Sequence, residues 1–465
     1  MPDIRQQGVP YYLTMEELAA CGPGAIPSEL QTDTHLIYNS PAALDFNSPG
    51  AQGFGVKRAG LSVPGSIMLL IAPGCCGRNT KALQAPGGYG ERFAYLMLTE
   101  NDIVTGKHLR KIPAAAATFV KSRPEKPTAL MICITCVDAL LGTDMERVCR
   151  QVEARLALPV RPCYMYALTR ESRLPPMTAI RQTVYSLLRP RKKRSNQVNL
   201  LGYFSPLAKD SELYALLAAI GVRHIGELAR CRDFADYEEL AAANFNLILD
   251  PEARQAASWF QKELQIPAIE LKRLYETDKI TSQYEGLSHV LGVSLRDQPY
   301  REEAEAARTD FCARYGETSI AVGSRLNANP FELTLALVRA GLSVQEVFAV
   351  PTPADFFYIR RLAELLPKLR LYTNLSPSML HYEETAHPVQ LALGVDACYY
   401  HPQAAQVPWN EEQQPFGHQG VRDLFRAMSR AMAERKQERE HTAAAGAADT
   451  AKGEREDKEE KEGKV

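Results

Sequence analysis

The sequence predicts an α/β protein built of three Rossmann-like domains, in which parallel sheets are flanked by helices. The first observation is a pair of nearly continuous apolar runs, SIMLLIAP (66–73) and TALMICIT (128–135), which are typical of strands buried on both faces. The second is that such runs alternate with helical patterns, as parallel strands require. The third is that the same alternation recurs twice later in the chain.

The first predicted domain covers residues 1–195. A shorter apolar run, PCYMYAL (162–168), predicts a third strand, and helical patterns at 112–122 and 145–158 stand between or after the strands. The basic segment RPRKKRS (189–195) then interrupts the pattern. A nucleic-acid or localisation patch is one interpretation, but the segment has no interleaved aromatic residues, which favours a solvated linker.

Two further α/β domains are predicted at 196–315 and 316–440. Strand and helix patterns alternate from about 198 to 264 and again from 318 to 374. A terminal helix follows, with Leu424, Met428 and Met432 at helical spacing. The last segment, 441–465, is highly charged and has nothing that could form a core, so we expect a disordered tail.

Composition restricts the class of protein. The formal net charge of −1 over 465 residues provides no basic field that would recruit nucleic acid. No apolar run is long enough to span a bilayer, and the first residues lack the apolar region of a secretory signal. We therefore expect a cytoplasmic protein without a nucleic-acid or membrane partner, whose ten cysteines serve metal binding or redox chemistry rather than disulfides.

Cysteines stand where the two longest apolar runs end. The run 66–73 is followed by Gly74-Cys75-Cys76-Gly77, and the run 128–135 is followed by Cys136. In open parallel sheets, ligands bind at the carboxyl ends of the strands. If both runs belong to one sheet, these three cysteines emerge at the same edge, next to glycines that allow a tight turn.

A helix start is predicted shortly after Cys136. Thr143 and Glu146 fit a capping box, so residues 137–142 form a loop and Cys136 is free to face a ligand. Thiolates at such an edge suit zinc, an iron–sulfur cluster or redox chemistry. From the residues alone, buried structural cysteines remain an alternative.

Other kinds of metal, redox or phosphate-binding site fit these residues less well. Zinc sites normally show a second close Cys/His pair, which is not evident here. Cys133 and Cys136 form a CxxC pattern, but Cys133 lies inside the apolar run, where we expect it to pack. The loop 74–81 lacks the second glycine followed by lysine and then serine or threonine that a P-loop requires, so the chain is not expected to bind ATP in that way.

These motifs resemble component 1 of nitrogenase and its relatives, which include dark-operative protochlorophyllide reductase and the nitrogenase cofactor-assembly scaffold. Residues 41–77 are similar to the N-terminal cluster region of that family. ITCVDALLGTDMERV (134–148) is similar to its Cys-x-x-x-(Leu/Ile)-Ile-Gly-Asp-Asp-(Ile/Val) motif, with Cys136 at the ligand position. VNLLGYF (198–204), NFNLIL (244–249) and PFGHQGVRDLF (415–425) follow in the family's order, so the resemblance spans roughly 38–432.

The resemblance implies a [4Fe–4S] or larger cluster held between two subunits. Cys75 or Cys76 fits the second ligand and Cys136 the third, whereas the first would fall near Ala51, which is not a cysteine. A cubane needs four ligands. Two cysteines from each of two like chains would supply them in a homodimer. Alternatively, both Cys75 and Cys76 bind, or a sister subunit of a heteromer completes the site.

The catalytic metal cofactor of nitrogenase is not expected here. Its cysteine ligand would fall near Asp250. Four histidines late in the chain also do not fit the family's histidine motif and are interpreted as surface or packing residues; they are His381, His387, His401 and His418.

The function implied by the resemblance is that of an anaerobic nitrogenase-like oxidoreductase. A separate, ATP-hydrolysing P-loop iron protein would deliver electrons to the cluster at Cys75, Cys76 and Cys136, and they would pass on to an unknown substrate. One alternative is a scaffold that assembles a metal cofactor for another enzyme. Another is a degenerate, non-catalytic subunit, which the residues at Ala51 and Asp250 favour.

Overall fold

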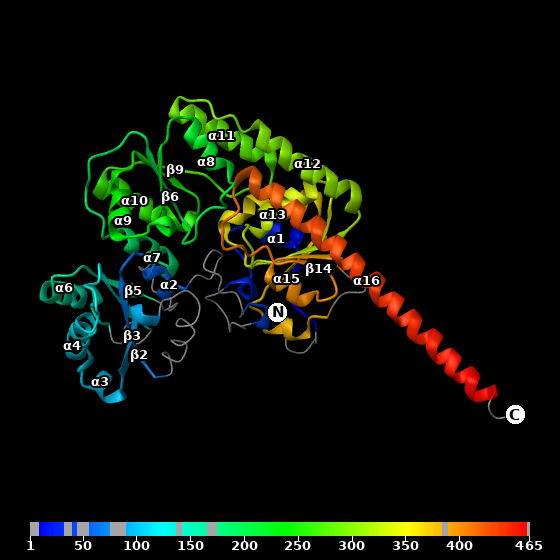
Figure 1. The fold of residues 1–465 in the computed structure, drawn as a ribbon, viewed down its shortest axis with the longest axis horizontal. Coiled ribbons are helices and arrows are strands. Elements are labelled where there is room, and N and C mark those ends of the chain that lie inside the picture. Colours follow the sequence, from blue (N-terminus) through cyan, green and yellow to red (C-terminus); the bar gives the residue numbers. More distant parts are fainter. Residues whose placement is uncertain are drawn as a thin grey trace.

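The computed structural model describes residues 9–31, 40–43, 55–74, 90–135, 142–164, 174–383 and 389–462, with side chains as far as His441. Its described part contains three separate sheets, each flanked by helices, whose strands are parallel except for one edge strand of the third sheet. In Figure 1 the first sheet lies at the lower left, the second above it and the third in the centre. The predicted fold class is therefore confirmed.

The first sheet has the strand order β3-β2-β4-β5 and is parallel throughout. Its strands are β2 (Ile67–Pro73), β3 (Phe93–Leu98), β4 (Leu130–Ile134) and β5 (Val160–Tyr164). Its helices are α2 (Val56–Gly60), α3 (Glu100–Val104), α4 (His108–Lys121), α6 (Met145–Leu156) and α7 (Pro176–Tyr185). Alternate residues of β2 point into two different hydrophobic cores. Leu69 packs in the core that includes α4 and α6, and Leu70 packs in the core that includes α2 and α7. Burial on both faces explains the nearly continuous apolar run.

The predicted capping box at Thr143 and Glu146 is wrong. Helix α6 begins one residue later, because Asp144 is its N-cap and accepts a hydrogen bond from the backbone N–H of Arg147 at 2.9 Å. Aspartate caps a helix at least as well as threonine. Glu146 instead accepts a hydrogen bond of 2.5 Å from the hydroxyl of Tyr164 on β5.

The second sheet has the order β7-β6-β8-β9, again parallel. Its elements are β6 (Gln197–Leu201), α8 (Glu212–Ala219), β7 (His224–Glu227), α9 (Phe234–Glu239), β8 (Phe245–Ile248), α10 (Arg254–Leu264) and β9 (Ala268–Glu270). The basic segment 189–195 is held against this unit. Arg191 pairs with Glu238 at 2.8 Å, and the amine of Lys193 donates to the carbonyl oxygen of Ala241 at 3.0 Å. The segment is thus a docked connector.

The third sheet has six strands in the order β1-β12-β11-β10-β13-β14. Its strands are β1 (Tyr12–Thr14), β10 (Ser319–Val322), β11 (Ser343–Phe348), β12 (Arg370–Tyr372), β13 (Leu391–Leu393) and β14 (Ala405–Val407). The helices packed around it are α1 (Met15–Cys21), α13 (Pro330–Arg339), α14 (Phe356–Leu365) and α15 (Val395–Tyr400). All neighbours are parallel except β1, which pairs antiparallel with β12.

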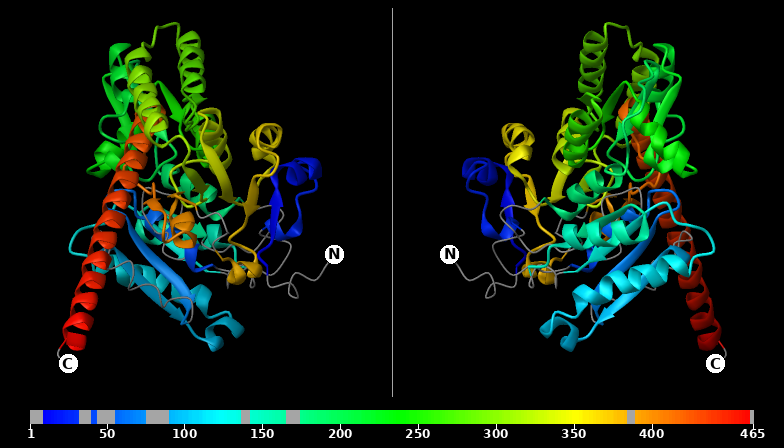
Figure 2. Two further views of the ribbon diagram at one scale, coloured as in Figure 1. Left: turned by 90° about the vertical axis from the view of Figure 1, so that its right-hand side faces the viewer. Right: turned by 90° about the vertical axis from the view of Figure 1, so that its left-hand side faces the viewer.

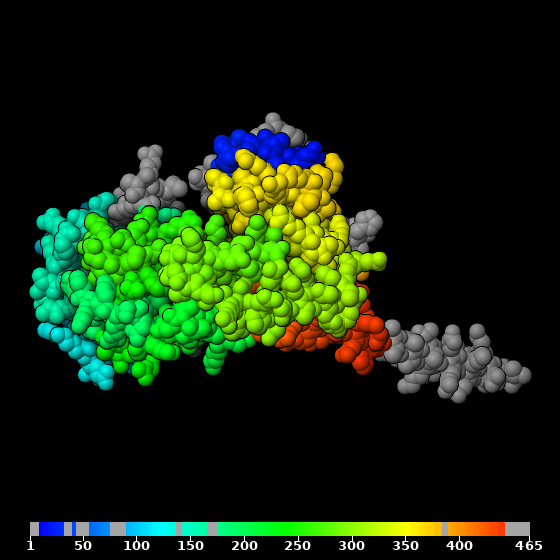
Figure 3. All heavy atoms as spheres, turned by 90° about the horizontal axis from the view of Figure 1, so that it is seen from above, coloured from blue at the N-terminus to red at the C-terminus, as the bar shows by residue number. Residues whose placement is uncertain are grey.

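The N-terminal residues therefore lie with the third sheet and not with the first. Figure 3 shows them, in blue, against the yellow residues of the third sheet's unit. The sequence assigns them to a domain of residues 1–195, and β1 gave no signal because it is only three residues long and half-exposed. The boundaries at 195/196, 315/316 and 440/441 stay predictions.

Three further helices pack beside the sheets: α11 (Thr277–Leu291), α12 (Gln298–Tyr315) and α16 (Gly417–Glu462). Helices α12 and α16 pack along each other, with the rings of Phe311 and Phe425 5.8 Å apart. The backbone of α16 continues through the charged end of the sequence and runs away from the sheets (Figures 1 and 2). Among the described helices, none combines the length and apolar character needed to cross a membrane.

Candidate functional site

Strands β2 and β4 end at the same edge of the first sheet. They are parallel neighbours with Ile71 opposite Ile134, so their carboxyl ends run out side by side. Gly74 follows β2 directly and Thr135 follows β4 directly. The expectation that both apolar runs belong to one sheet and end at one edge is confirmed. The predicted ligands that come next, Cys75, Cys76 and Cys136, lie outside the described residues, and their role as ligands stays a prediction.

This edge is also the topological switch point of the sheet. After β2 the chain adds β3 on one side, and it then returns to add β4 and β5 on the other. Ligands of open parallel sheets bind in the crevice at such a point. The three cysteines are therefore adjacent in sequence to the place where the topology favours a ligand.

The switch points of the other two sheets hold protein groups. In the third sheet, Asp396 accepts hydrogen bonds from the backbone of Ser324 at 2.9 Å and of Arg325 at 3.0 Å and from the side chain of Asn374 at 2.7 Å. A Cβ on Gly323 would lie 2.0 Å from Asp396 Oδ1. The crevice of the third sheet is thus closed by its own carboxylate.

In the second sheet, the switch point between β6 and β8 is occupied by Asp250. Its carboxylate accepts from the backbone N–H of Glu252 at 2.9 Å and lies 3.8 Å from the guanidinium of Arg181 on α7. A Cβ on Gly202 would come within 2.7 Å of Asp250, which explains the glycine. The position near which the resemblance implies a cofactor cysteine therefore carries an aspartate engaged in local structure.

Thr135, at the first switch point, and Lys57, on the helix α2 that packs on the same sheet, are described polar groups near the predicted ligands in the sequence or in the fold. The hydroxyl of Thr135 is 4% exposed and has no hydrogen-bond partner in the described part of the chain. Leaving such a group unpaired is costly, so it accommodates a further polar partner. Lys57 on α2 is half-buried near Cys133, and burial lowers the pKa of its amine. Within the described residues it forms no ion pair, so its charge is available to a negative group. The thiolates that would bind a cluster lie outside the described residues, so an iron–sulfur cluster at this edge stays a prediction.

Cys133 packs in the sheet, as expected. It is fully buried in β4, with Leu70 and Cys163 as its neighbours on the adjacent strands. Burial raises the pKa of its thiol to about 12, so it is a poor thiolate ligand or nucleophile. The seven cysteines in the described part are free thiols, and no group of three or more metal-binding side chains forms among the described residues.

The late histidines are not arranged as metal ligands. His381 is exposed, and His387 lies outside the described residues. His401 and His418 are fully buried, so their interpretation as packing residues is confirmed. Each faces a carboxylate: His401 Nε2 lies 3.3 Å from Glu346 Oε2, and His418 Nε2 lies 2.9 Å from Asp297 Oδ2.

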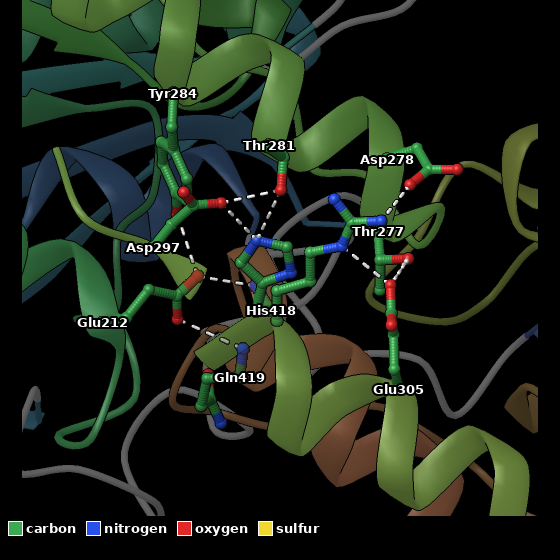
Figure 4. A network of polar contacts seen from close by, with 10 residues as sticks. Glu212, Thr277, Asp278, Thr281, Tyr284, Asp297, Glu305, His418 and Gln419 are labelled. Carbon is green, nitrogen blue, oxygen red and sulfur yellow. Dashed lines mark hydrogen bonds and ion pairs between the residues drawn. The ribbon is translucent and has the colours of Figure 1, made fainter. Parts of the chain in front are cut away.

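A buried polar network at the start of α16 escaped the sequence analysis. Glu212 of α8 accepts hydrogen bonds from the backbone N–H groups of His418 at 2.5 Å and Gln419 at 3.1 Å and from the hydroxyl of Tyr284 at 2.9 Å. Figure 4 shows this carboxylate between the three groups. It satisfies N–H groups that a helix start leaves unpaired, so the network anchors α16. The sequence alone does not mark this network, since the need for glycine at Gly417 appears only in its φ of +66° and its close contact with Glu212.

Comparisons with known proteins agree with this geometry. The family model described as nitrogenase component 1 type oxidoreductase matches residues 51–394. The nitrogenase iron-molybdenum cofactor biosynthesis protein NifE of Sinorhizobium fredii (strain NBRC 101917 / NGR234) is 25% identical over 358 residues, which cover 72% of this chain and 71% of that protein. NifE of Rhizobium meliloti (strain 1021) is 30% identical over 129 residues, and the match spans only 27% of each protein.

The fold is also that of solved nitrogenase structures. The structure described as "Nitrogenase Cp1 at pH 6.5" superimposes with a TM-score of 0.63 at 14% identity, covering 88% of this chain and 95% of the other. At this identity the likeness concerns the fold. Because the family model matches well over half of the sequence, however, the chain belongs to the nitrogenase component 1 type oxidoreductase family.

Proposed function

We propose that the protein is an iron–sulfur protein of the nitrogenase component 1 type that accepts electrons from an ATP-dependent P-loop iron protein and passes them to a substrate not yet identified. Members of the family bind metal–sulfur clusters and work in multi-subunit complexes with an iron protein. The observation that carries the proposal is the shared edge of β2 and β4, because the chain continues from both strand ends directly into cysteines.

Cys136 and one or both of Cys75 and Cys76 would hold the cluster. One chain offers at most three thiolates at this edge, and a [4Fe–4S] cluster takes four, so a second subunit completes the site. That subunit is a second copy of this chain or a sister component 1 subunit. When bound, such a cluster stores and transfers single electrons.

The described residues support the site in three ways. The hydroxyl of Tyr95 donates to the carbonyl oxygens of Ala72 at 2.9 Å and Pro73 at 2.7 Å, which fixes the end of β2. Thr135, which precedes Cys136, offers a hydroxyl that has no hydrogen-bond partner among the described residues. Lys57, which lies near Cys133, would supply positive charge, and such a charge stabilises thiolates and a reduced cluster.

The first test is the iron and sulfide content of the full chain purified anaerobically. We expect about four irons per two chains, with an electron paramagnetic resonance (EPR) signal after reduction. Cys136→Ser should lose the iron, whereas Cys21→Ser, which changes an exposed cysteine of α1, should retain it. Wild-type protein without iron, or Cys136→Ser with unchanged iron, would falsify the proposal.

A cofactor-assembly scaffold is the second candidate, favoured by the names of the curated relatives, which are cofactor biosynthesis proteins. One experiment distinguishes the two functions: the cluster-loaded protein is incubated with an iron protein and ATP, and the iron that it retains is measured. A reductase keeps its iron through repeated oxidation and reduction. A scaffold transfers metal to a cofactor-free acceptor protein.

A further inference from the structure

Five tyrosine rings form an unbroken chain through the unit of the third sheet. The order is Tyr12, Tyr372, Tyr382, Tyr400 and Tyr399, and successive ring centroids are 5.5, 5.3, 4.9 and 5.3 Å apart. The two end members are 42% and 53% exposed, whereas Tyr372 and Tyr400 are buried. The chain therefore joins two points of the surface through the interior.

The tyrosine at the centre of this chain has a buried proton acceptor. The hydroxyl of Tyr382 donates to Glu346 Oε2 at 2.5 Å. His401 Nε2 lies 3.1 Å from the same hydroxyl and 3.3 Å from the same carboxylate oxygen. Glu346 and His401 are at most 1% exposed, so water does not compete for this contact.

The charge states suit proton transfer. Burial acts to raise the pKa of Glu346, but hydrogen bonds from His401 and Tyr382 outweigh it and hold that pKa below its usual value, so the carboxylate is ionised. Burial and the charge of Glu346 raise the pKa of Tyr382, which keeps the resting phenol protonated. Removal of an electron makes a phenol a strong acid, and the adjacent carboxylate is then a ready base.

We propose that Tyr382 is an oxidisable tyrosine at the centre of a chain that carries one-electron oxidising equivalents between the protein surface and the third sheet's unit. The oxidant is a strong one-electron acceptor of the radical or high-valent metal class that meets the exposed ring of Tyr12 or Tyr399. Its reaction removes one electron from that ring. An electron from Tyr382 then reduces the oxidised ring by way of Tyr372 or Tyr400.

The step balances within the described residues. Tyr382 loses one electron to the neighbouring oxidised ring, its O–H bond breaks, and the proton passes to Glu346 Oε2. The products are a neutral tyrosyl radical at 382 and a protonated Glu346. A one-electron reductant restores the phenolate, which takes the proton back from Glu346.

The neighbours of each ring explain why the radical would settle at Tyr382. The ring of Phe348 stacks on Tyr400 at 4.8 Å and on Tyr372 at 5.6 Å, which shields both from water. Phenylalanine has no hydroxyl and gives no neutral radical of this kind. Tyr400 shares its hydroxyl with Ser40 at 2.6 Å and Asn374 at 3.1 Å, neither of which is a base. Among the three inner rings, Tyr382 is half-buried and has the short contact with an ionised carboxylate.

The test uses the full-length chain and a photogenerated ruthenium(III) polypyridyl complex as the oxidant. We expect a long-lived tyrosyl radical, detected by optical absorbance and by EPR after freezing, with slower formation in D2O. Tyr382→Phe should lose the long-lived radical. Glu346→Gln, which keeps a hydrogen-bond acceptor but removes the base, should shorten its lifetime and abolish the D2O effect. The control is Tyr203→Phe, because Tyr203 is not one of the five tyrosines in the chain of rings and its hydroxyl donates to the carbonyl oxygen of Leu249. This variant should leave the radical unchanged.

Two results would overturn the proposal. One is a radical of wild-type yield and lifetime in Tyr382→Phe, which would locate it at the surface tyrosines. The other is a wild-type protein that forms no long-lived radical although Tyr399 is oxidised. If Tyr382→Phe unfolds, judged by circular dichroism, the Glu346→Gln lifetime and D2O effect decide the question. An unchanged lifetime there rejects the assigned proton acceptor.

Discussion

Arg181 of α7 donates through Nε to the carbonyl oxygen of Gly202 at 2.8 Å, which joins a helix of the first sheet's unit to the end of the first strand of the second sheet. Its guanidinium also pairs with Glu252 at 2.5 Å and lies over the ring of Phe204 at 5.0 Å. The side chain is only 10% exposed. One residue therefore holds two units together at a switch point.

We expect Arg181→Ala to lower the free energy of unfolding by about 2 kcal/mol, because it leaves the carbonyl oxygen of the buried Gly202 without its donor. Urea unfolding measures the effect. The control Arg232→Ala removes a guanidinium whose side chain is 85% exposed and pairs with Asp236, and it should change stability little. Equal effects of the two variants would contradict a joining role for Arg181.

Glu332 should make stability depend on pH. Its carboxyl on α13 is buried and accepts the backbone N–H of Tyr275 at 2.9 Å, and burial raises its pKa from 4.5 to about 8. The folded protein thus binds this proton more tightly than the unfolded chain. The resulting stability is present below pH 4.5 and is lost as the pH rises through about 8.

Glu332→Gln should therefore flatten the fall of unfolding free energy between these two pH values, by up to about 1.4 kcal/mol per unit of pKa shift. Its advantage over the wild type should be greatest at the alkaline end. Urea titrations at a series of pH values measure this, with the exposed Glu364→Gln as the control. A parallel pH profile for Glu332→Gln and wild type would show that Glu332 is not the responsible group.

Gly417 should tolerate no side chain. A Cβ there would lie 1.9 Å from Glu212 Oε1 and 2.4 Å from the hydroxyl of Tyr284, at a φ of +66°. We expect Gly417→Ala to cost at least about 2 kcal/mol, from backbone strain and a disrupted helix start. The matched variant Gly286→Ala lies inside α11 with nothing within 4 Å and should gain up to about 1 kcal/mol. Thermal unfolding of the two proteins should shift in opposite directions.

Lys57 should tune the proposed cluster. Loss of a nearby positive charge disfavours the more negative, reduced state, so Lys57→Gln should move the midpoint potential to more negative values, by tens of millivolts. Lys57→Arg keeps the charge and should restore most of the shift. Redox titration followed by EPR measures this, together with iron content. Full iron with an unchanged potential in Lys57→Gln would contradict the role without affecting the cluster assignment.

The sequence predicts a structural feature well when residues close together in the sequence determine that feature. Strands β2 and β4 were predictable because burial on both faces leaves a continuous apolar run, and their shared edge follows from the rule for parallel strands. Strands β13 and β14 were missed because they have three residues each, too few for any periodicity. The carboxylate that anchors α16 could not be found, because Glu212 and His418 are separated by 206 residues.

The pairing of Tyr12 with Tyr372 also sets an order of events during synthesis. Chains fold as they emerge, with N-terminal units first. Here β1 leaves the ribosome well before its partner β12, so Met15 and Leu18 of α1 stay exposed until the strands of the third sheet have been made. The first and second sheets can form meanwhile. Helix α1 therefore reaches its place after residues that are made later, and a ribosome that stalls before β12 leaves its apolar face without a partner.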